Sequence, residues 1–350
     1  MKKNHVAPLL ALFVVLSCSR AFAQDLTVDS GFTQQSLADI QASTGGFDTD
    51  SSGNIYYAGY QDSDPTEDNQ VVEMTQASNY AFSTVIVDYG TSTYPSFLTL
   101  QGSTLYYGDS VNVNETSIPV LTPQAPTVIA NMPDNYDMAF SGATTLVSAN
   151  IDGGAAFLPE SDVYSVSLTS GSYQEILSTA DYSGPIRFDS SGDLLYGASG
   201  AAAVGGGIYE FTQSQLNSAI TSGTALQLSQ GNMIISNSGN SDFVVVGDDL
   251  FDAFNPYSQT GEVSTLTEYN LLTGAVTNIG SLANEGLYFT GMSYLNGDLI
   301  VAETDGGFGN TYTDFIQIAP IPEPRSTWLA AFGFLAVVCF HRRHPRRSLP

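Results

Sequence analysis

The sequence predicts an all-β, six-bladed β-propeller, and three observations lead to this fold class. A hairpin pattern, in which an apolar strand, a glycine turn and a strand rich in Tyr, Leu and Val follow one another, recurs six times. Only the segment from Thr212 to Ile220 has a helical pattern. The turn glycines lie 40 to 55 residues apart, about 49 on average, at Gly53, Gly102, Gly142, Gly192, Gly247 and Gly297. Repeats of this period with four strands each are typical of propellers.

Further strand-like segments follow most of the hairpins. Third strands are expected at residues 71–74, 163–166, 208–211 and 266–269, and fourth strands at residues 84–87, 127–130 and 275–278. The last repeat shows three strands, and Leu26–Asp29 is expected to supply its fourth. Such sharing would close the ring and remove its open edges. A seven-bladed ring or a pair of β-sandwiches are the alternative folds.

Charge is distributed very unevenly along the chain. The formal net charge is −26, with 9 Lys and Arg against 35 Asp and Glu. Between Gln24 and Ile321 the chain has a single cation, Arg187, and no Lys, His, Cys or Trp. A protein this acidic has no electrostatic means of binding phosphate backbones, so nucleic-acid partners are excluded.

The missing residue types also exclude much chemistry. Without His, Cys or Lys the body can form no Ser-His-Asp triad, cysteine nucleophile or lysine Schiff base. Zinc and most transition metals need imidazole or thiolate ligands. Carboxylate, hydroxyl, amide and backbone groups remain, and among metal cofactors these groups suit calcium. We assign no catalytic residue from the sequence.

Several acidic and aromatic groups are candidates for sites. Asp48 and Asp50 begin a segment with the spacing of a calcium loop, but its twelfth position is Gly59; Asp62 and Asp64 belong to a second acidic loop. All four are weak calcium candidates, because Asp is also common in solvated turns. Further carboxylates at strand ends, which a glycosidase could use in pairs, are Asp248, Asp249, Asp252, Glu303 and Asp305. The strand tyrosines, expected mainly to pack between blades, are Tyr56, Tyr57, Tyr106, Tyr107 and Tyr196.

The N-terminus has the features of a secretory signal peptide at residues 1–23. Lys2 and Lys3 precede an apolar stretch, and Ala21 and Ala23 form a small-x-small cleavage site that predicts a mature start at Gln24. A lipoprotein signal ending at Cys18 is the alternative. Either interpretation predicts that the body, residues 24–319, is exported.

The C-terminal segment, residues 320–350, has three parts. Pro322, Glu323 and Pro324 come first, and an apolar run from Thr327 to Phe340 follows. As a helix this run would span about 21 Å, which is short of the roughly 30 Å core of a bilayer. We therefore expect a transient inner-membrane association, with the basic residues left in the cytoplasm. The proposed membrane residues are Thr327, Trp328, Leu329, Phe332, Phe334, Leu335, Val337, Val338 and Phe340, and the basic anchor is Arg342, Arg343, Arg346 and Arg347.

This three-part tail resembles the PEP-CTERM sorting signal of exported bacterial proteins. Pro322, Glu323 and Pro324 match its name-giving motif, although Arg325 separates them from the Ser-Thr-Trp that commonly follows. The resemblance covers about 30 residues and implies processing by an exosortase, after signal peptidase has removed the leader. It also implies an exopolysaccharide- or biofilm-producing host. Separately, the Asp-Ser-Ser-Gly turns look like those of NHL-type six-bladed propellers.

These features predict an exported, exosortase-processed protein of the cell surface or extracellular matrix, without catalytic activity and associated with exopolysaccharide. Two alternatives remain. One is a secreted carbohydrate-active hydrolase or lyase that uses carboxylates around a central channel. The other is a calcium-dependent adhesion module.

Overall fold

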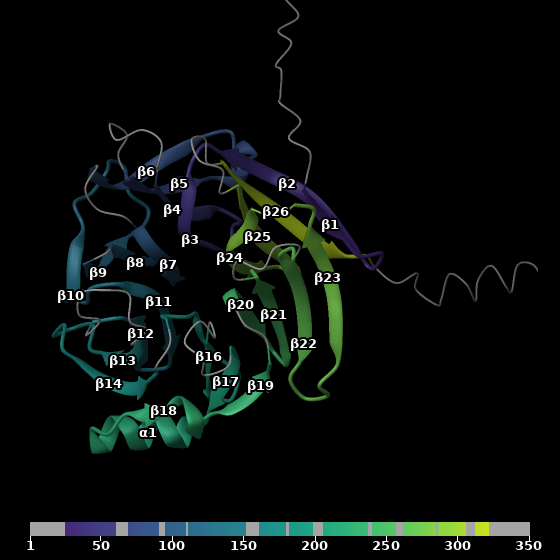
Figure 1. The fold of residues 1–350 in the computed structure, drawn as a ribbon. Coiled ribbons are helices and arrows are strands. Elements are labelled where there is room, and N and C mark those ends of the chain that lie inside the picture. Colours follow the sequence, from purple (N-terminus) through teal and green to yellow (C-terminus); the bar gives the residue numbers. More distant parts are fainter. Residues whose placement is uncertain are drawn as a thin grey trace, which may run out of the picture.

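The computed structural model describes residues 25–60, 69–90, 95–109, 111–151, 161–179, 182–198, 206–236, 240–256, 262–284, 286–305 and 312–321. These residues form six antiparallel blades arranged in a ring, as Figure 1 shows. The predicted six-bladed propeller is therefore confirmed, and the seven-bladed and sandwich alternatives are wrong.

The first three blades follow the chain in order from the inner to the outer strand. Blade 1 consists of β3 (Ser43–Thr49), β4 (Ile55–Tyr60), β5 (Asn69–Met74) and β6 (Ser83–Gly90). Blade 2 consists of β7 (Pro95–Gln101), β8 (Thr104–Asp109), β9 (Asn112–Ser117) and β10 (Thr127–Asn131). Blade 3 consists of β11 (Asn135–Ser141), β12 (Thr144–Ala149), β13 (Asp162–Val166) and β14 (Tyr173–Ser178), with β18 (Leu226–Gln227) added in parallel.

The other three blades complete the ring. Blade 4 consists of β15 (Ile186–Phe188), β16 (Leu194–Ala198), β17 (Gly207–Phe211) and β19 (Asn232–Ile235). Blade 5 consists of β20 (Asn240–Val246), β21 (Asp249–Phe254), β22 (Thr265–Asn270) and β23 (Val276–Leu282), with β1 (Leu26–Val28) as a fifth strand. Blade 6 consists of β24 (Leu287–Leu295), β25 (Asp298–Asp305), β26 (Tyr312–Pro320) and β2 (Phe32–Ile40).

Each predicted turn glycine lies between the first and second strands of one blade. All six have positive φ angles, for example +63° at Gly247 and +84° at Gly53, a region that side chains other than glycine disfavour. This conformation lets two antiparallel strands reverse direction over few residues. The glycine spacing therefore identified the hairpins correctly.

The N-terminus closes the ring, but not with the segment that the sequence suggested. Leu26–Val28 pairs with β23 of blade 5, and the nine-residue strand β2 pairs with β26 of blade 6. Figure 1 shows the purple β2 alongside the yellow-green β26. Both β2 and β26 are nine residues long, and a bulge between Ser36 and Ala38 interrupts the alternation in β2.

Short helical elements lie in some of the connections between strands. The predicted helix is present as α1 (Gln213–Ser222), and the Thr212 side chain accepts from the Gln215 amide at its start. Its buried Leu216 and Ala219 pack on the outside of blades 3 and 4. The 3₁₀ turn Gln76–Ser78 follows β5, the third strand of blade 1, and the 3₁₀ turn Leu228–Gln230 follows β18. None of the helices in the described ranges is long and apolar enough to cross a membrane.

Six clusters of buried apolar side chains fill the six seams between blades. At the seam of blades 6 and 1, Phe315 packs against Phe47 and Tyr57 with ring centroids 5.1 and 5.7 Å apart. The five candidate tyrosines are all buried, with exposures of 9% or less. They pack within the blades and seams, as expected, and are not available to stack on a sugar.

Candidate functional site

The central channel is the main polar site of the described structure. Its wall is made by the inner strands β3, β7, β11, β15, β20 and β24, which contribute to two cavities of about 640 and 220 Å³. Arg187 lines both cavities and so lies between them. Its guanidinium pairs with Asp137 on blade 3 and with Asp242 on blade 5, the latter at 2.7 Å. The lone cation of the body therefore joins three consecutive blades.

Three aspartates accept hydrogen bonds across the blade seams, and Asp48 and Asp242 do so with both of their oxygens. Asp48 accepts from the backbone amide of Leu100 on blade 2 at 2.9 Å, and the Ser293 hydroxyl of blade 6 donates to its other oxygen at 3.0 Å. Asp137 accepts from the Ile186 amide of blade 4 at 2.8 Å.

Asp242 makes the equivalent contact with the Met292 amide of blade 6, also at 2.8 Å. Each aspartate also accepts from the amide of the residue that follows it in its own strand. All six carboxylate oxygens therefore have hydrogen-bond donors.

The remaining seam, between blades 2 and 3, has a neutral link. The Ser96 hydroxyl of blade 2 donates to the Asn135 side chain of blade 3, and Asn135 in turn donates to the Asp109 carbonyl at 2.6 Å. A continuous ring of polar contacts thus surrounds the channel. Since buried polar groups are costly unless paired, this ring fixes how the blades meet.

Burial determines the electrostatics of the channel. Burial raises the pKa of Asp242 to about 6, against the opposing effect of Arg187, and the nearby Asp137 raises it further. Burial alone would lower the pKa of Arg187, but Asp137 and Asp242 outweigh it and raise that pKa. The channel therefore holds one guanidinium between two buried carboxyl groups.

Asp252 is a buried carboxyl behind this site. It is 1% exposed on β21, and neither of its oxygens has a hydrogen-bond partner. Its side chain lies on the same face as Leu250, which packs against Leu195 and Ile208 of blade 4. Burial raises the pKa of Asp252 to about 7, and the charge of Asp242 adds to this rise.

We expect the propeller to lose stability as the pH rises through 7. The folded-state pKa of Asp252 lies above its unfolded value near 4, so the folded state binds this proton more tightly. The stabilisation that comes from protonated Asp252 is fully present below about pH 4, and it is lost as the pH rises from there through about 7. The melting midpoint should therefore fall by about 5 °C or more between pH 5 and pH 8, measured by differential scanning calorimetry.

Asp252→Asn provides the control, because general charge repulsion changes in the same direction. The variant should melt higher than the wild type at pH 8 and show a flatter pH profile. An unchanged profile would mean that Asp252 is already ionised in the folded protein at pH 5.

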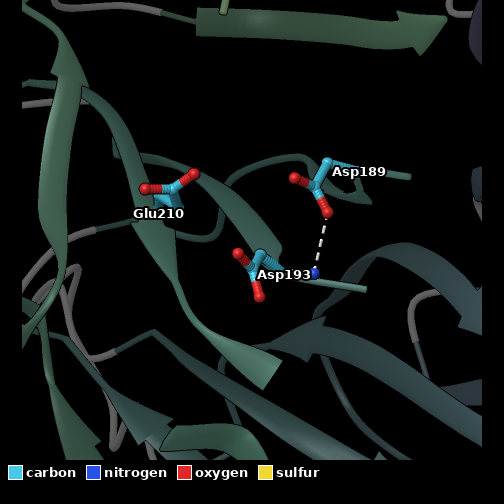
Figure 2. Close-up of side chains that lie close together, drawn as sticks. All are labelled: Asp189, Asp193 and Glu210. Carbon is cyan, nitrogen blue, oxygen red and sulfur yellow. Dashed lines mark hydrogen bonds between the residues drawn. The ribbon is translucent and has the colours of Figure 1, made fainter. Parts of the chain in front are cut away.

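A second acidic group lies on the rim of blade 4. Asp189, Asp193 and Glu210 each place one carboxylate oxygen within 4.8 Å of the other two. Figure 2 shows these three side chains gathered together. Asp189 caps the hairpin turn by accepting from the amides of Ser191 at 2.9 Å and Asp193 at 2.8 Å. Asp193 accepts from the Gln213 amide at the start of α1 at 2.6 Å.

Blade 1 contains the same arrangement with neutral donors in it. Asp50 caps the equivalent turn, and the Asn54 side chain donates to its second oxygen at 2.8 Å. The Tyr56 hydroxyl lies 3.2 Å from Asp50 and 3.1 Å from Glu73. In blade 4, Asp193 and Leu195 occupy the positions of Asn54 and Tyr56, so both side-chain donors are missing.

This internal comparison predicts that Asp193→Asn stabilises the protein. The new amide can donate to Asp189, as Asn54 does to Asp50, and one like charge is removed. We expect a gain of about 0.5–1 kcal/mol, seen as a rise of about 1–3 °C in melting midpoint.

The reciprocal change Asn54→Asp should lower the midpoint. The control is Asp248→Asn, which removes one charge from the exposed turn of blade 5. If that variant gains as much, the effect is a general charge effect rather than a local hydrogen bond.

Blade 3 carries a neutral hollow on its outer part. It has a volume of about 630 Å³ and is lined largely by hydroxyl and amide side chains. Tyr173, at 42% exposure, stands at this surface with its ring edge-on to Tyr164, their centroids 5.6 Å apart. The other polar lining residues are Thr145, Ser165, Ser167, Thr169, Ser172 and Gln174.

The calcium candidates do not meet at one site in the described structure. Asp48 serves the channel seam, whereas Asp50 caps a turn. Asp62 and Asp64 lie outside the described residues, as do the cleavage residues Ala21, Ala23 and Gln24. The sorting motif Pro322–Pro324, the apolar run 327–340 and the arginines that follow also lie outside them.

The described fold defines a closed six-bladed β-propeller, and comparisons with known proteins agree with that class. No family model and no curated protein matches the sequence. A gluconolactonase from Xanthomonas campestris superposes with a TM-score of 0.56 at 10% identity, covering 81% of this chain and 89% of that one. A protein assigned as TolB from Agrobacterium tumefaciens gives 0.51 at 10% identity, covering 84% and 100%. At this identity the similarity shows the fold alone.

Proposed function

We propose that this protein is a non-catalytic, exported propeller that is sorted to the cell surface or extracellular matrix and associates with exopolysaccharide. The observation that carries the non-catalytic part is the engagement of the channel acids. Every oxygen of Asp48, Asp137 and Asp242 accepts a hydrogen bond, and at least one oxygen of each accepts from a neighbouring blade. A general acid or nucleophile must instead be free to reach a substrate. The signal peptide and the Pro322–Pro324 tail support export and processing by an exosortase.

The hollow on blade 3 is the surface that we propose for the polysaccharide. Neutral sugars are bound by hydrogen-bonding groups together with an aromatic face, and Tyr173 and its hydroxyl-rich surroundings supply both. A neutral site also avoids the acidic surface, which would repel an anionic polymer. The alternative, a carbohydrate-active hydrolase or lyase, would need a pair of free carboxylates near a cavity.

One experiment tests binding and catalysis together. Purified protein is mixed with exopolysaccharide from the producing bacterium, and co-sedimentation and new reducing ends are measured in the same tube. Binding without new ends supports the proposal. Tyr173→Ala should reduce the bound fraction several-fold, whereas Phe82→Ala, at an aromatic residue 75% exposed on blade 1, should not. New reducing ends would instead show a hydrolase or lyase.

A further inference from the structure

Blade 6 carries a row of three carboxylates across its outer strands. Glu303 on β25 lies directly opposite Asp314 on β26, which lies directly opposite Asp39 on β2. Residues paired in this way share one face of a sheet, with Cβ atoms about 4.5–5.5 Å apart. Val301 and Ile316 on the same face pack into the seam with blade 5, so the row faces that seam.

The inner end of the row is buried and incompletely paired. Glu303 is 7% exposed, and the amide of Leu26, at the start of β1, donates to it. Its oxygen Oε2 is buried without a hydrogen-bond partner. Burial raises the pKa of Glu303 to about 7, and the charges of Asp314 and Asp25 add to the rise.

The outer end of the row opens to solvent. Asp39 is exposed and Asp314 is half-buried. The Ser36 hydroxyl donates to Asp314 at 2.7 Å. Burial raises the pKa of Asp314 to about 7, and a hydrogen bond with Asp39, which requires a proton, contributes to that rise. The row therefore runs from solvent to a buried oxygen that has no donor.

No side-chain cation of the propeller can neutralise these charges. Arg187 is the only Lys or Arg between residues 24 and 321, and it is held between Asp137 and Asp242 in the channel. Like charges directly opposite one another destabilise a sheet. Protons or ions from solvent must therefore compensate the row.

We propose that this row binds a divalent metal cation of the calcium type, which ties the N-terminal strands to blade 6. Glu303 and Asp314 would be its principal ligands, with Asp39 at the entrance and Asp25 beside the buried end. The ligands are oxygens only, and residues 24–321 contain no His or Cys. Calcium accepts six to eight oxygen ligands in irregular geometry, whereas zinc prefers nitrogen and sulfur.

The geometry sets how the ion would be held. Among the described residues, only Asp189, Asp193 and Glu210 form a group of three whose carboxylate oxygens already lie within 4.8 Å of one another. An ion in the row is therefore coordinated by two carboxylates at a time and completes its shell with backbone or water oxygens. Since carboxylates bind metal in their deprotonated form, binding releases protons near pH 7 and weakens as the pH falls.

The test is calcium titration of the purified full-length chain by isothermal calorimetry, with ionic strength held constant by KCl. We expect one ion per chain, with affinity that decreases between pH 8 and pH 6. Glu303→Gln and Asp314→Asn preserve shape and should each weaken binding at least tenfold. Asp193→Asn, which alters the blade 4 cluster, is the matched control and should leave the affinity unchanged.

A second measurement reports on the location of the ion. Calcium should slow amide hydrogen exchange in β2 and β26, which the row joins, in the wild type but not in Glu303→Gln. The proposal is wrong if the wild type binds no calcium. It is equally wrong if binding survives in both row variants and is lost in Asp193→Asn, which would place the ion on blade 4. Neither outcome bears on polysaccharide binding.

Discussion

Replacing Arg187 with methionine is expected to destabilise the propeller by about 3–5 kcal/mol, lowering its melting midpoint by roughly 6–15 °C. The methionine fills much of the same volume but leaves Asp137 and Asp242 without their cation. Their side chains are only 10% and 14% exposed, so water cannot replace the guanidinium. The cost comes mainly from two uncompensated buried charges rather than from the lost contact itself.

Two further variants separate charge from geometry in this prediction. Arg187→Lys keeps the positive charge but cannot span two carboxylates with a planar fork, so we expect an intermediate loss. Combining Arg187→Met with Asp137→Asn removes one of the stranded charges and should recover part of the loss. Thermal unfolding at pH 7.5 measures all three. If the double variant is no more stable than Arg187→Met, buried charge is not the cause.

The charged residues of the channel occupy a regular position in the sequence repeat, but the repeat alone does not show that they meet in space. In four of the six repeats a charged residue stands five positions before the turn glycine: Asp48, Asp137, Arg187 and Asp242. When the repeats are aligned on their apolar residues, three of them begin at Met138, Phe188 and Phe243. Each of these begins one residue after the charged residue and so leaves it out of the repeat. Even with the register correct, the sequence does not show that strands about 50 residues apart meet around one axis.

The strand pattern was predicted more completely, because each hairpin is a local structure. Glycine at positive φ and alternating apolar residues determine a hairpin within about twelve residues. The sequence does not indicate the outer strands β9, β14 and β19. The strand β9, NVNETS, has one apolar residue, and β19, NMII, is only four residues long. The strand β2, FTQQSLADI, has few apolar residues and a bulge, so the sequence favours the more regular Leu26–Asp29 in its place. Its partner β26 lies some 280 residues away, a distance that no local pattern spans.

That nonlocal pairing leads to the second large expected effect, which two truncations can resolve. A chain whose mature form begins at Gly31 loses β1 alone, and one that begins at Gln41 loses both β1 and β2. The first removes Leu26, which is 1% exposed, from the seam of blades 5 and 6. We expect it to fold with a melting midpoint lower by several degrees, because blade 5 keeps four strands.

The second truncation should abolish the monomeric fold. It leaves the nine residues of β26 as an unpaired edge and removes the closure that holds blade 6 to the N-terminus. Exposed edges of this length pair with other chains, so size-exclusion chromatography should show oligomers and calorimetry should show no cooperative transition. A peptide spanning residues 31–41, added during refolding, should restore the monomer because it can occupy the position of β2. A monomeric shorter chain with the wild-type midpoint would mean that the six blades hold together without this closure.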